Sequence, residues 1–218
     1  MTREELIKKV ALKMDEVSSS DDVRVPVTAG DNNPLYTQIN NLLNESVNDV
    51  LAKAPIYRLY NHVGKVPSAN SQRLLFGGAR QAAVITVPDD FIRLVSISDN
   101  SFQRPIVDLA IEGDDVDKRQ HNKYLVAKTA KPVAVLCSNK TAGGREILCY
   151  SYASGDSVKP TMLYIKRYDN DRETSAETDL DEYMIDIVSW VCAGRVFAVQ
   201  GDVAKGKICD ENASSLMI

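Results

Sequence analysis

Acid–base or metal chemistry would need carboxylates and histidines held close together, and this chain offers few of them. Asp89 and Asp90 follow Pro88 directly, between two apolar runs. Neighbouring residues on a strand point to opposite faces, so the pair predicts a turn between strands rather than a shared proton or metal site. The two histidines, His62 and His121, have no serine, cysteine or aspartate at a catalytic motif spacing. A triad assembled from distant residues stays open.

Phosphate loops and zinc sites have recognisable patterns, and neither pattern occurs here. Lys140 and Thr141 precede Gly143 and Gly144, whereas a phosphate loop places its lysine after the glycines. We expect the four cysteines to be buried reduced thiols, since they are widely spaced and form no C-x-x-C pair: Cys137, Cys149, Cys192 and Cys209. The sequence therefore predicts a protein without metal, cofactor or enzymatic activity.

The charge layout is more informative than any motif. Residues 118–140 hold six cations and no acid, and residues 169–186 hold eight acids against one base, Arg172. Opposed blocks on one chain can be complementary between neighbouring copies, which favours a head-to-tail ring. The alternative is that both blocks are solvated loops. The predicted subunit interface comprises Lys118, Arg119, Lys123, Lys128, Lys131, Asp179, Asp181 and Glu182.

The composition excludes several classes of protein. Of the 218 residues 44% are hydrophobic and 26% charged, and the net charge of −4 argues against a general nucleic-acid binder. No apolar run approaches the roughly 20 residues that span a bilayer. The N-terminus alternates charged with apolar residues, so we expect no secretory signal, no membrane association and an intracellular origin.

The chain ends in three apolar residues after the polar stretch DENASS. Such an end often frays, but it can also insert into a groove of a partner. We interpret Leu216, Met217 and Ile218 as a partner-docking segment.

Helical patterns lie near both ends of the chain. Residues 3–17 form an apolar stripe preceded by a capping box of Thr2 and Glu5, and Pro34 opens a second helix that runs to about residue 53. A third helix is predicted from an N-cap at Asp179, with Asp181 in its first turn, through Gln200. Residues after Gly201 predict a weaker, glycine-interrupted segment.

The middle of the chain has the pattern of short strands separated by turns. Residues 56–63 predict either a strand or a continued helix, residues 64–80 a loop, and residues 114–122 a helical turn or a loop. The six candidate strands are residues 82–87, 91–97, 104–109, 131–137, 146–152 and 162–167. Such strands suggest an antiparallel sandwich or an open barrel.

Together these patterns predict an α+β fold with two parts. Residues 1–55 and 179–218 form a helical framework, a bundle of the N-terminal and C-terminal helices. Residues 56–178 form an inserted, β-rich part, an antiparallel β-sandwich or open barrel.

Three short motifs in this arrangement are similar to one protein family. They are the strand entry Pro88–Arg93, the strand start Lys131-Pro132, and the helix end with Gly-Asp at Val196–Asp202. With helices around a β insertion, they resemble head-to-tail adaptor proteins of tailed phages. The similarity is strongest to connector or ring proteins of short-tailed phages, including the crAss-like group.

The resemblance implies a structural virion protein at the head–tail junction, assembled in the host cytoplasm. It implies a ring, commonly of twelve copies, that binds the portal protein above and tail or ring proteins below. DNA would pass through its channel without specific binding. Two alternatives remain: a small-molecule or carbohydrate-binding module on the β-rich part, and a hydrolase built from scattered polar residues.

Overall fold

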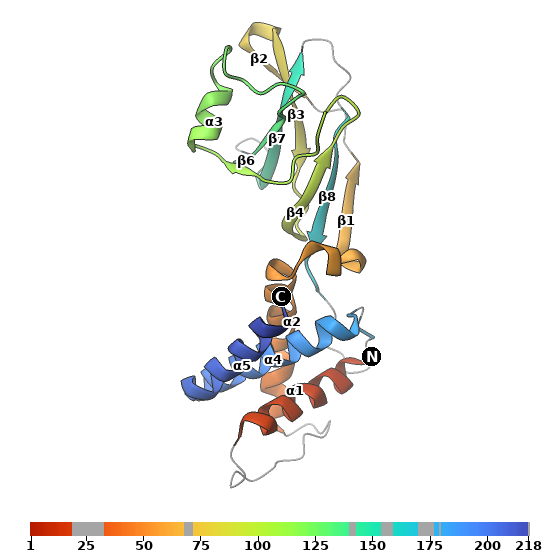
Figure 1. The fold of residues 1–218 in the computed structure, drawn as a ribbon, viewed down its shortest axis with the longest axis vertical. Coiled ribbons are helices and arrows are strands. Elements are labelled where there is room, and N and C mark those ends of the chain that lie inside the picture. Colours follow the sequence, from red (N-terminus) through yellow and green to blue (C-terminus); the bar gives the residue numbers. More distant parts are fainter. Residues whose placement is uncertain are drawn as a thin grey trace. The chain divides into compact units, whose positions relative to one another are not determined.

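The computed structural model divides the chain into two compact units (Figure 1). The helical unit comprises Met1–Asn61 and Arg167–Ile218, and the β unit comprises His62–Lys166. The structure describes residues 1–18, 33–67, 72–139, 143–153, 159–169, 177–178 and 180–217. The predicted α+β class is confirmed, since helices from both ends of the chain pack together and two mostly antiparallel sheets are inserted between them.

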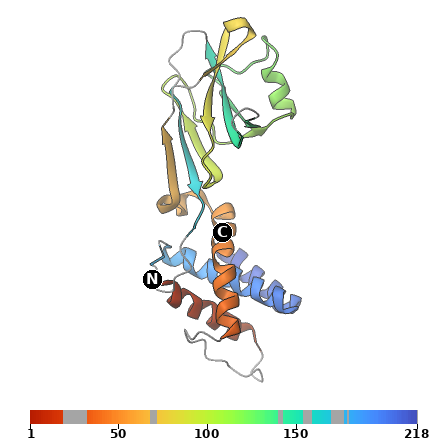
Figure 2. The same ribbon diagram turned by 180° about the vertical axis from the view of Figure 1, so that it is seen from behind.

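Four helices build the helical unit: α1 (Arg3–Val17), α2 (Pro34–Lys53), α4 (Glu182–Gln200) and α5 (Val203–Leu216). Helix α4 packs against the other three, and the view from behind shows the same arrangement (Figure 2). Its buried residues include Ile185, Ile187 and Trp190, on more than one face, as expected for a helix enclosed by neighbours. The core of this unit therefore joins the two ends of the sequence.

The ends of the helices follow local capping rules. Thr2 and Glu5 form the predicted capping box, in which the Thr2 N–H donates to Glu5 Oε2 at 2.9 Å. Asn33 caps α2, accepting from the N–H groups of Leu35 and Tyr36 at 3.1 and 3.3 Å. Both signals are local in sequence, which is why these helix starts were predictable.

The C-terminal helices correct two predictions. The N-cap of α4 is Asp181, whose Oδ1 accepts from the Met184 N–H at 2.7 Å, and Asp179 lies outside the described residues. After Gly201 ends α4 with a φ of +86°, α5 is a regular helix rather than a weak segment. Its Gly206 lies against Gly194 of α4, so this glycine permits close helix packing instead of interrupting the helix.

The β unit holds two sheets. The three-stranded sheet has the order β1 (Val63–Pro67), β8 (Thr161–Lys166), β4 (Phe91–Ser98). The five-stranded sheet has the order β2 (Gln72–Leu75), β3 (Arg80–Thr86), β7 (Arg145–Ala153), β6 (Val133–Ser138), β5 (Ala110–Ile111). All described pairs of strands are antiparallel except β5 and β6.

The five-stranded sheet is buried on both faces, which explains the continuous burial of β7. One face shares an apolar core with the other sheet, including Ile85, Ile97, Ile147 and Met162. The opposite face packs against Val126 and Ala127 of the segment that follows α3 (Asp115–Gln120). Residues 115–127 therefore form a cover for this sheet.

Several segments differ from their predicted state. Residues 104–109 form a single bridge from Ile106 to Ile97, and the short strand β5 comes after them. Residues 56–62 form two 3-10 turns, neither a strand nor a continued α-helix. β1 and β2 lie where a loop was predicted; both are short, and their pairing with β8 and β3 makes them strands. Within the described ranges, no helix is long and apolar enough to cross a membrane.

Candidate functional site

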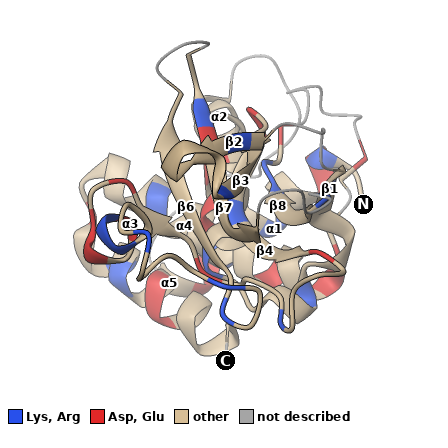
Figure 3. Ribbon diagram, turned by 90° about the horizontal axis from the view of Figure 1, so that it is seen from above, with Lys and Arg blue, Asp and Glu red and all other residues tan. Residues whose placement is uncertain are grey.

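The basic block lies on the surface of the β unit, along α3 and the loop into β6 (Figure 3). Its five described cations, Lys118, Arg119, Lys123, Lys128 and Lys131, are all exposed, and Lys140 lies outside the described residues. Lys118 Nζ lies 3.4 Å from Asp115 on the same helix, an exposed pair of small energetic weight. The block therefore presents its charge to solvent.

Two large apolar side chains are exposed within the basic block. Tyr124 is 80% exposed and Leu125 60% exposed, and Lys123 Nζ lies 4.8 Å from the centre of the Tyr124 ring. Single exposed apolar residues are ordinary, but Tyr124 and Leu125 are adjacent, and tyrosine is a residue type enriched at protein interfaces.

The backbone under this block is held by buried polar groups. Asp114 caps α3 by accepting from the Asp117 N–H at 2.7 Å. The buried Gln120 donates to Val116 O at 2.9 Å and accepts from the Ala127 N–H at 2.9 Å, which links the helix to the following loop. Sequence reasoning missed Gln120, because its partners seven residues away are set by the loop conformation.

The acidic block belongs to the helical unit. Glu182 and Asp169 are exposed and Asp186 is half-buried, whereas Asp181 is engaged as the N-cap of α4. Asp171, Glu173 and Asp179 lie outside the described residues. Of the predicted acidic interface residues, Glu182 is therefore the exposed one that the structure describes.

The predicted docking segment is the end of a helix rather than a separate tail. Leu216 is the last residue of α5, Met217 follows it half-buried, and Ile218 lies outside the described residues. Leu216 lines a groove of about 550 Å³ together with Val17, Trp190 and Ile208. The apolar end thus contributes to a surface of the helical unit.

The Asp89–Asp90 pair lies in the turn between β3 and β4, as predicted. Asp90 Oδ1 accepts from the Tyr164 hydroxyl at 2.9 Å. Burial, followed by this hydrogen bond, raises the pKa of Tyr164 to about 12. Asp90 thus holds the turn against β8.

The four cysteines are buried free thiols, as predicted. Burial raises the pKa of Cys137, Cys192 and Cys209 to about 11, and raises that of Cys149 further. A protonated thiol is a poor nucleophile and a poor metal ligand at neutral pH. Among the residues that the structure describes, no group of three or more histidine, cysteine or acidic side chains could hold a metal ion.

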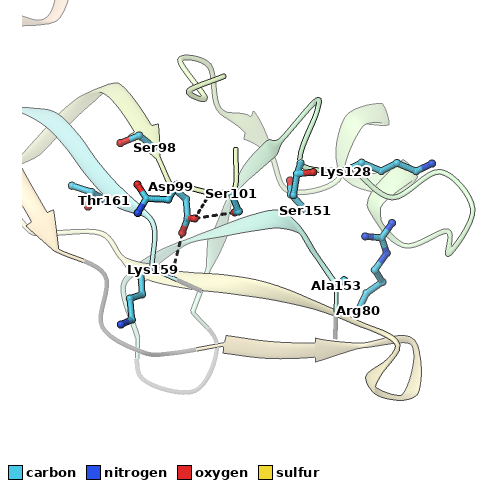
Figure 4. Close-up of a pocket in the computed structure, with 11 residues that line it drawn as sticks. Arg80, Ser98, Asp99, Ser101, Lys128, Ser151, Ala153, Lys159 and Thr161 are labelled. Atoms are coloured by element: carbon cyan, nitrogen blue, oxygen red, sulfur yellow. Dashed lines mark hydrogen bonds between the residues drawn. The ribbon is translucent and has the colours of Figure 1, made fainter. Parts of the chain in front are cut away.

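A polar cavity of about 960 Å³ lies in the β unit around Asp99 (Figure 4). Asp99 Oδ1 accepts from the N–H and hydroxyl of Ser101 at 2.9 and 2.8 Å, and Oδ2 accepts from the Tyr152 hydroxyl and the Lys159 N–H at 3.1 and 2.9 Å. Burial alone would raise the pKa of Asp99, but these hydrogen bonds outweigh it and lower the pKa. Asp99 therefore organises the cavity wall as a carboxylate.

Sequence reasoning did not find this cavity. The Asp-Asn-Ser stretch at residues 99–101 was visible as a turn signal, and the Ser101 N–H does donate to Asp99. The facing residues come from β3, β7 and the segment before β6, so their approach depends on the assembled sheets.

Comparison with known protein families and with curated proteins gives no match for this chain.

Proposed function

We propose that this chain is a structural virion protein, an adaptor ring that joins a phage portal to the tail and continues the DNA channel. The observation that carries the proposal is the exposed basic block with Tyr124 and Leu125 inside it. Cations around an exposed aromatic residue suit a partner surface that is acidic and partly apolar. In a ring, the acidic block of the neighbouring copy provides that surface.

The location of each block on the fold supports the same proposal. The basic block lies on a helix and loop held by Asp114 and Gln120, and the described acids Asp181, Glu182 and Asp186 lie at the start of α4. These described charges are thus carried by folded elements, which lowers the ordering cost of their association. The mechanism is assembly, without a chemical step.

The test is the mass of assembled particles, measured by light scattering with and without a portal-containing extract. The unmodified chain should enter a complex of roughly twelve copies. In such a closed ring the same contact repeats between every pair of neighbouring subunits. The variant K123E/K128E/K131E should fail to assemble, because its new glutamates would face the acidic block of the neighbouring copy. Adding E182K/D186K to the same chain should restore assembly. Asp181 is left unchanged because its loss would uncap α4.

A matched control changes two exposed cations outside both blocks, K65E/K207E, and should leave assembly intact. Assembly that ignores the triple reversal, or a chain that stays monomeric with its portal present, would contradict the proposal.

The alternative, a small-molecule or carbohydrate-binding module, would use the cavity around Asp99. None of its described lining residues is aromatic, so it offers no ring for a sugar to stack on. This lining favours a small polar ligand over a carbohydrate.

A further inference from the structure

We propose that the cavity around Asp99 binds a phosphate group. Three cations and one carboxylate line it: Arg80, Lys128, Lys159 and Asp99. In Figure 4 the side chains of Arg80 and Lys128 lie at the end of the cavity where Ser151 is, whereas the side chain of Lys159 points away from them at the other end. Among the described residues, neither Arg80 nor Lys128 forms a side-chain ion pair.

The carboxylate does not oppose this assignment. Both oxygens of Asp99 already accept two hydrogen bonds each, from Ser101, Tyr152 and Lys159. Its acceptor capacity is therefore used within the protein, and its charge is spread over four donors. The groups of the cavity lining that remain for a ligand are therefore hydrogen-bond donors.

Ser151 provides an independent indication of a ligand. Its side chain is 98% buried at the cavity wall, and its hydroxyl has no hydrogen-bond partner among the described residues. Tyr152 pairs with Gln81 and Tyr150 with Ala82, so Ser151 is the extra residue of a β-bulge. Bulges often redirect a side chain next to a binding site.

The chemistry of the donors matches a phosphate rather than a carboxylate or a sugar. Besides the cations, the lining carries the hydroxyls of Ser98, Ser101, Thr129, Ser151 and Thr161 and the amide of Asn100. Arginine, lysine, hydroxyl and amide groups are donors that bind the oxygens of phosphate groups. Without an aromatic residue in the described lining, the site holds the phosphate and does not read a base.

The test is equilibrium dialysis of the full chain against radiolabelled inorganic phosphate at constant ionic strength. Saturable binding is expected below about 20 mM, the range of weak single-site affinities. R80Q/K128Q should weaken binding at least tenfold, since charge-assisted hydrogen bonds contribute most. S151A should weaken it severalfold without lowering the midpoint of thermal unfolding, because its hydroxyl has no described partner to lose.

K65Q removes an exposed lysine of the same unit outside the cavity and should bind phosphate normally. If circular dichroism shows that the double variant is misfolded, the single variant K128Q replaces it, because this lysine is exposed and its change should not affect folding. Absence of saturable binding, or unchanged binding in R80Q/K128Q, would overturn the proposal. Unchanged binding in S151A would overturn the part assigned to the bulge.

A duplex oligonucleotide added to the dialysis separates two sources of the phosphate group. Displacement of phosphate identifies a nucleic-acid backbone as the ligand, and retention of phosphate identifies a small phosphorylated compound. Lys128 belongs to both the basic block and the cavity, whereas Arg80 lies outside the basic block. R80Q should therefore weaken phosphate binding and leave ring assembly unchanged, which separates the two proposals.

Discussion

The helical unit and the β unit hold a buried charged side chain in different ways. In the helical unit, the fully buried Arg3 of α1 donates to the side chains of Asn40 and Asn44 on α2, at 2.6 and 2.7 Å. In the β unit, the buried Glu146 meets Arg73, whose side chain is half exposed, at the edge of an otherwise apolar core. The charge of Arg3 is thus bound by asparagine side chains in a fully buried position, whereas the charge of Glu146 is paired with a partly exposed arginine.

The asparagines of α2 show what this difference achieves. Asn40, Asn44 and Asn48 recur every fourth residue and therefore share one helix face. Asn48 accepts from the Tyr168 N–H at 2.8 Å and donates to Tyr168 O at 3.0 Å, as a paired strand would. One stripe of amides thus binds both α1 and the segment after β8. Directional contacts of this kind specify one arrangement of the helices, whereas apolar packing alone tolerates several.

The largest effect is expected from breaking the buried arginine. R3A leaves the oxygens of Asn40 and Asn44 without their charged donor, at a cost of about 3 kcal/mol in the free energy of unfolding. Hydrogen exchange read by mass spectrometry should show faster exchange in α1, α2 and α4 and unchanged exchange in β3 and β7. R3K should recover little, since an ammonium cannot reproduce the fork of hydrogen bonds.

K8A supplies the control for this variant, because Lys8 pairs with Glu4 on the exposed face of the same helix and should change stability by under about 0.5 kcal/mol. Equal loss of protection in the sheets of R3A would show that the two units unfold as one.

The converse variant places a methyl group in the β unit. A Cβ at Gly64 would lie 2.6 Å from the ring of Tyr164 and 2.9 Å from Lys166 Cε. G64A should therefore destabilise by about 2 kcal/mol through overpacking. Exchange should rise in β1, β8 and β4 while α4 stays protected. Y164L makes room, so the double variant should be more stable than the sum of the single effects predicts.

A smaller effect, with a pH dependence, is expected at Asp99. The pKa of Asp99 is lowered in the folded state, so its contribution to stability is present above its ordinary pKa and is lost as pH falls through the lowered value. D99N keeps an acceptor for Ser101 but loses the acceptor of Tyr152 and Lys159, at a cost of about 1 kcal/mol near neutral pH. Urea unfolding should show this difference shrinking as the pH is lowered from 6 to 3. A difference that stays constant would contradict the ionic role.

The helices of the helical unit were easier to predict from the sequence than the strands of the β unit. The capping box of α1 and the start of α2 at Pro34 were predicted because their signals lie within a few residues, and the stripe of α4 because it repeats at the helical period. The asparagine stripe was visible, but its partners Arg3 and Tyr168 lie 37 to 120 residues away along the chain. β1 and β2 have no strong strand pattern of their own, and their neighbours in the sheet decide their conformation.

The candidate sites follow the same rule. The exposed basic block was predictable because charge clusters in the sequence stay on a surface when they include no acid. The cavity was not, since it needs the bulge at Ser151 and the approach of Arg80 and Asp99 from other strands and loops. A register irregularity leaves no signature in one sequence, because both strands keep their alternation on either side of it.

The smallest effect is expected from a methyl group added at the contact of α4 with α5. It tests whether packed helices tolerate an added methyl group better than the sheet does. A Cβ at Gly194 would lie 3.1 Å from Asp210 Oδ1, 3.2 Å from Cys209 Cβ and 3.3 Å from Gly206 O. The first atom can move, and alanine gains up to about 1 kcal/mol in helix propensity over glycine. G194A should therefore change stability by under about 1 kcal/mol.

Chemical denaturation of G194A beside G64A makes the comparison direct, since each adds one methyl group. G201A is the matched control: it has no atom within 4 Å, but its φ of +86° costs about 1 kcal/mol for any residue with a Cβ. If G194A costs as much as G64A, the two helices are held as rigidly as the sheet. In that case the backbone contact of Gly194 with Gly206, rather than the polar stripe of α2, would set the geometry of the helical unit.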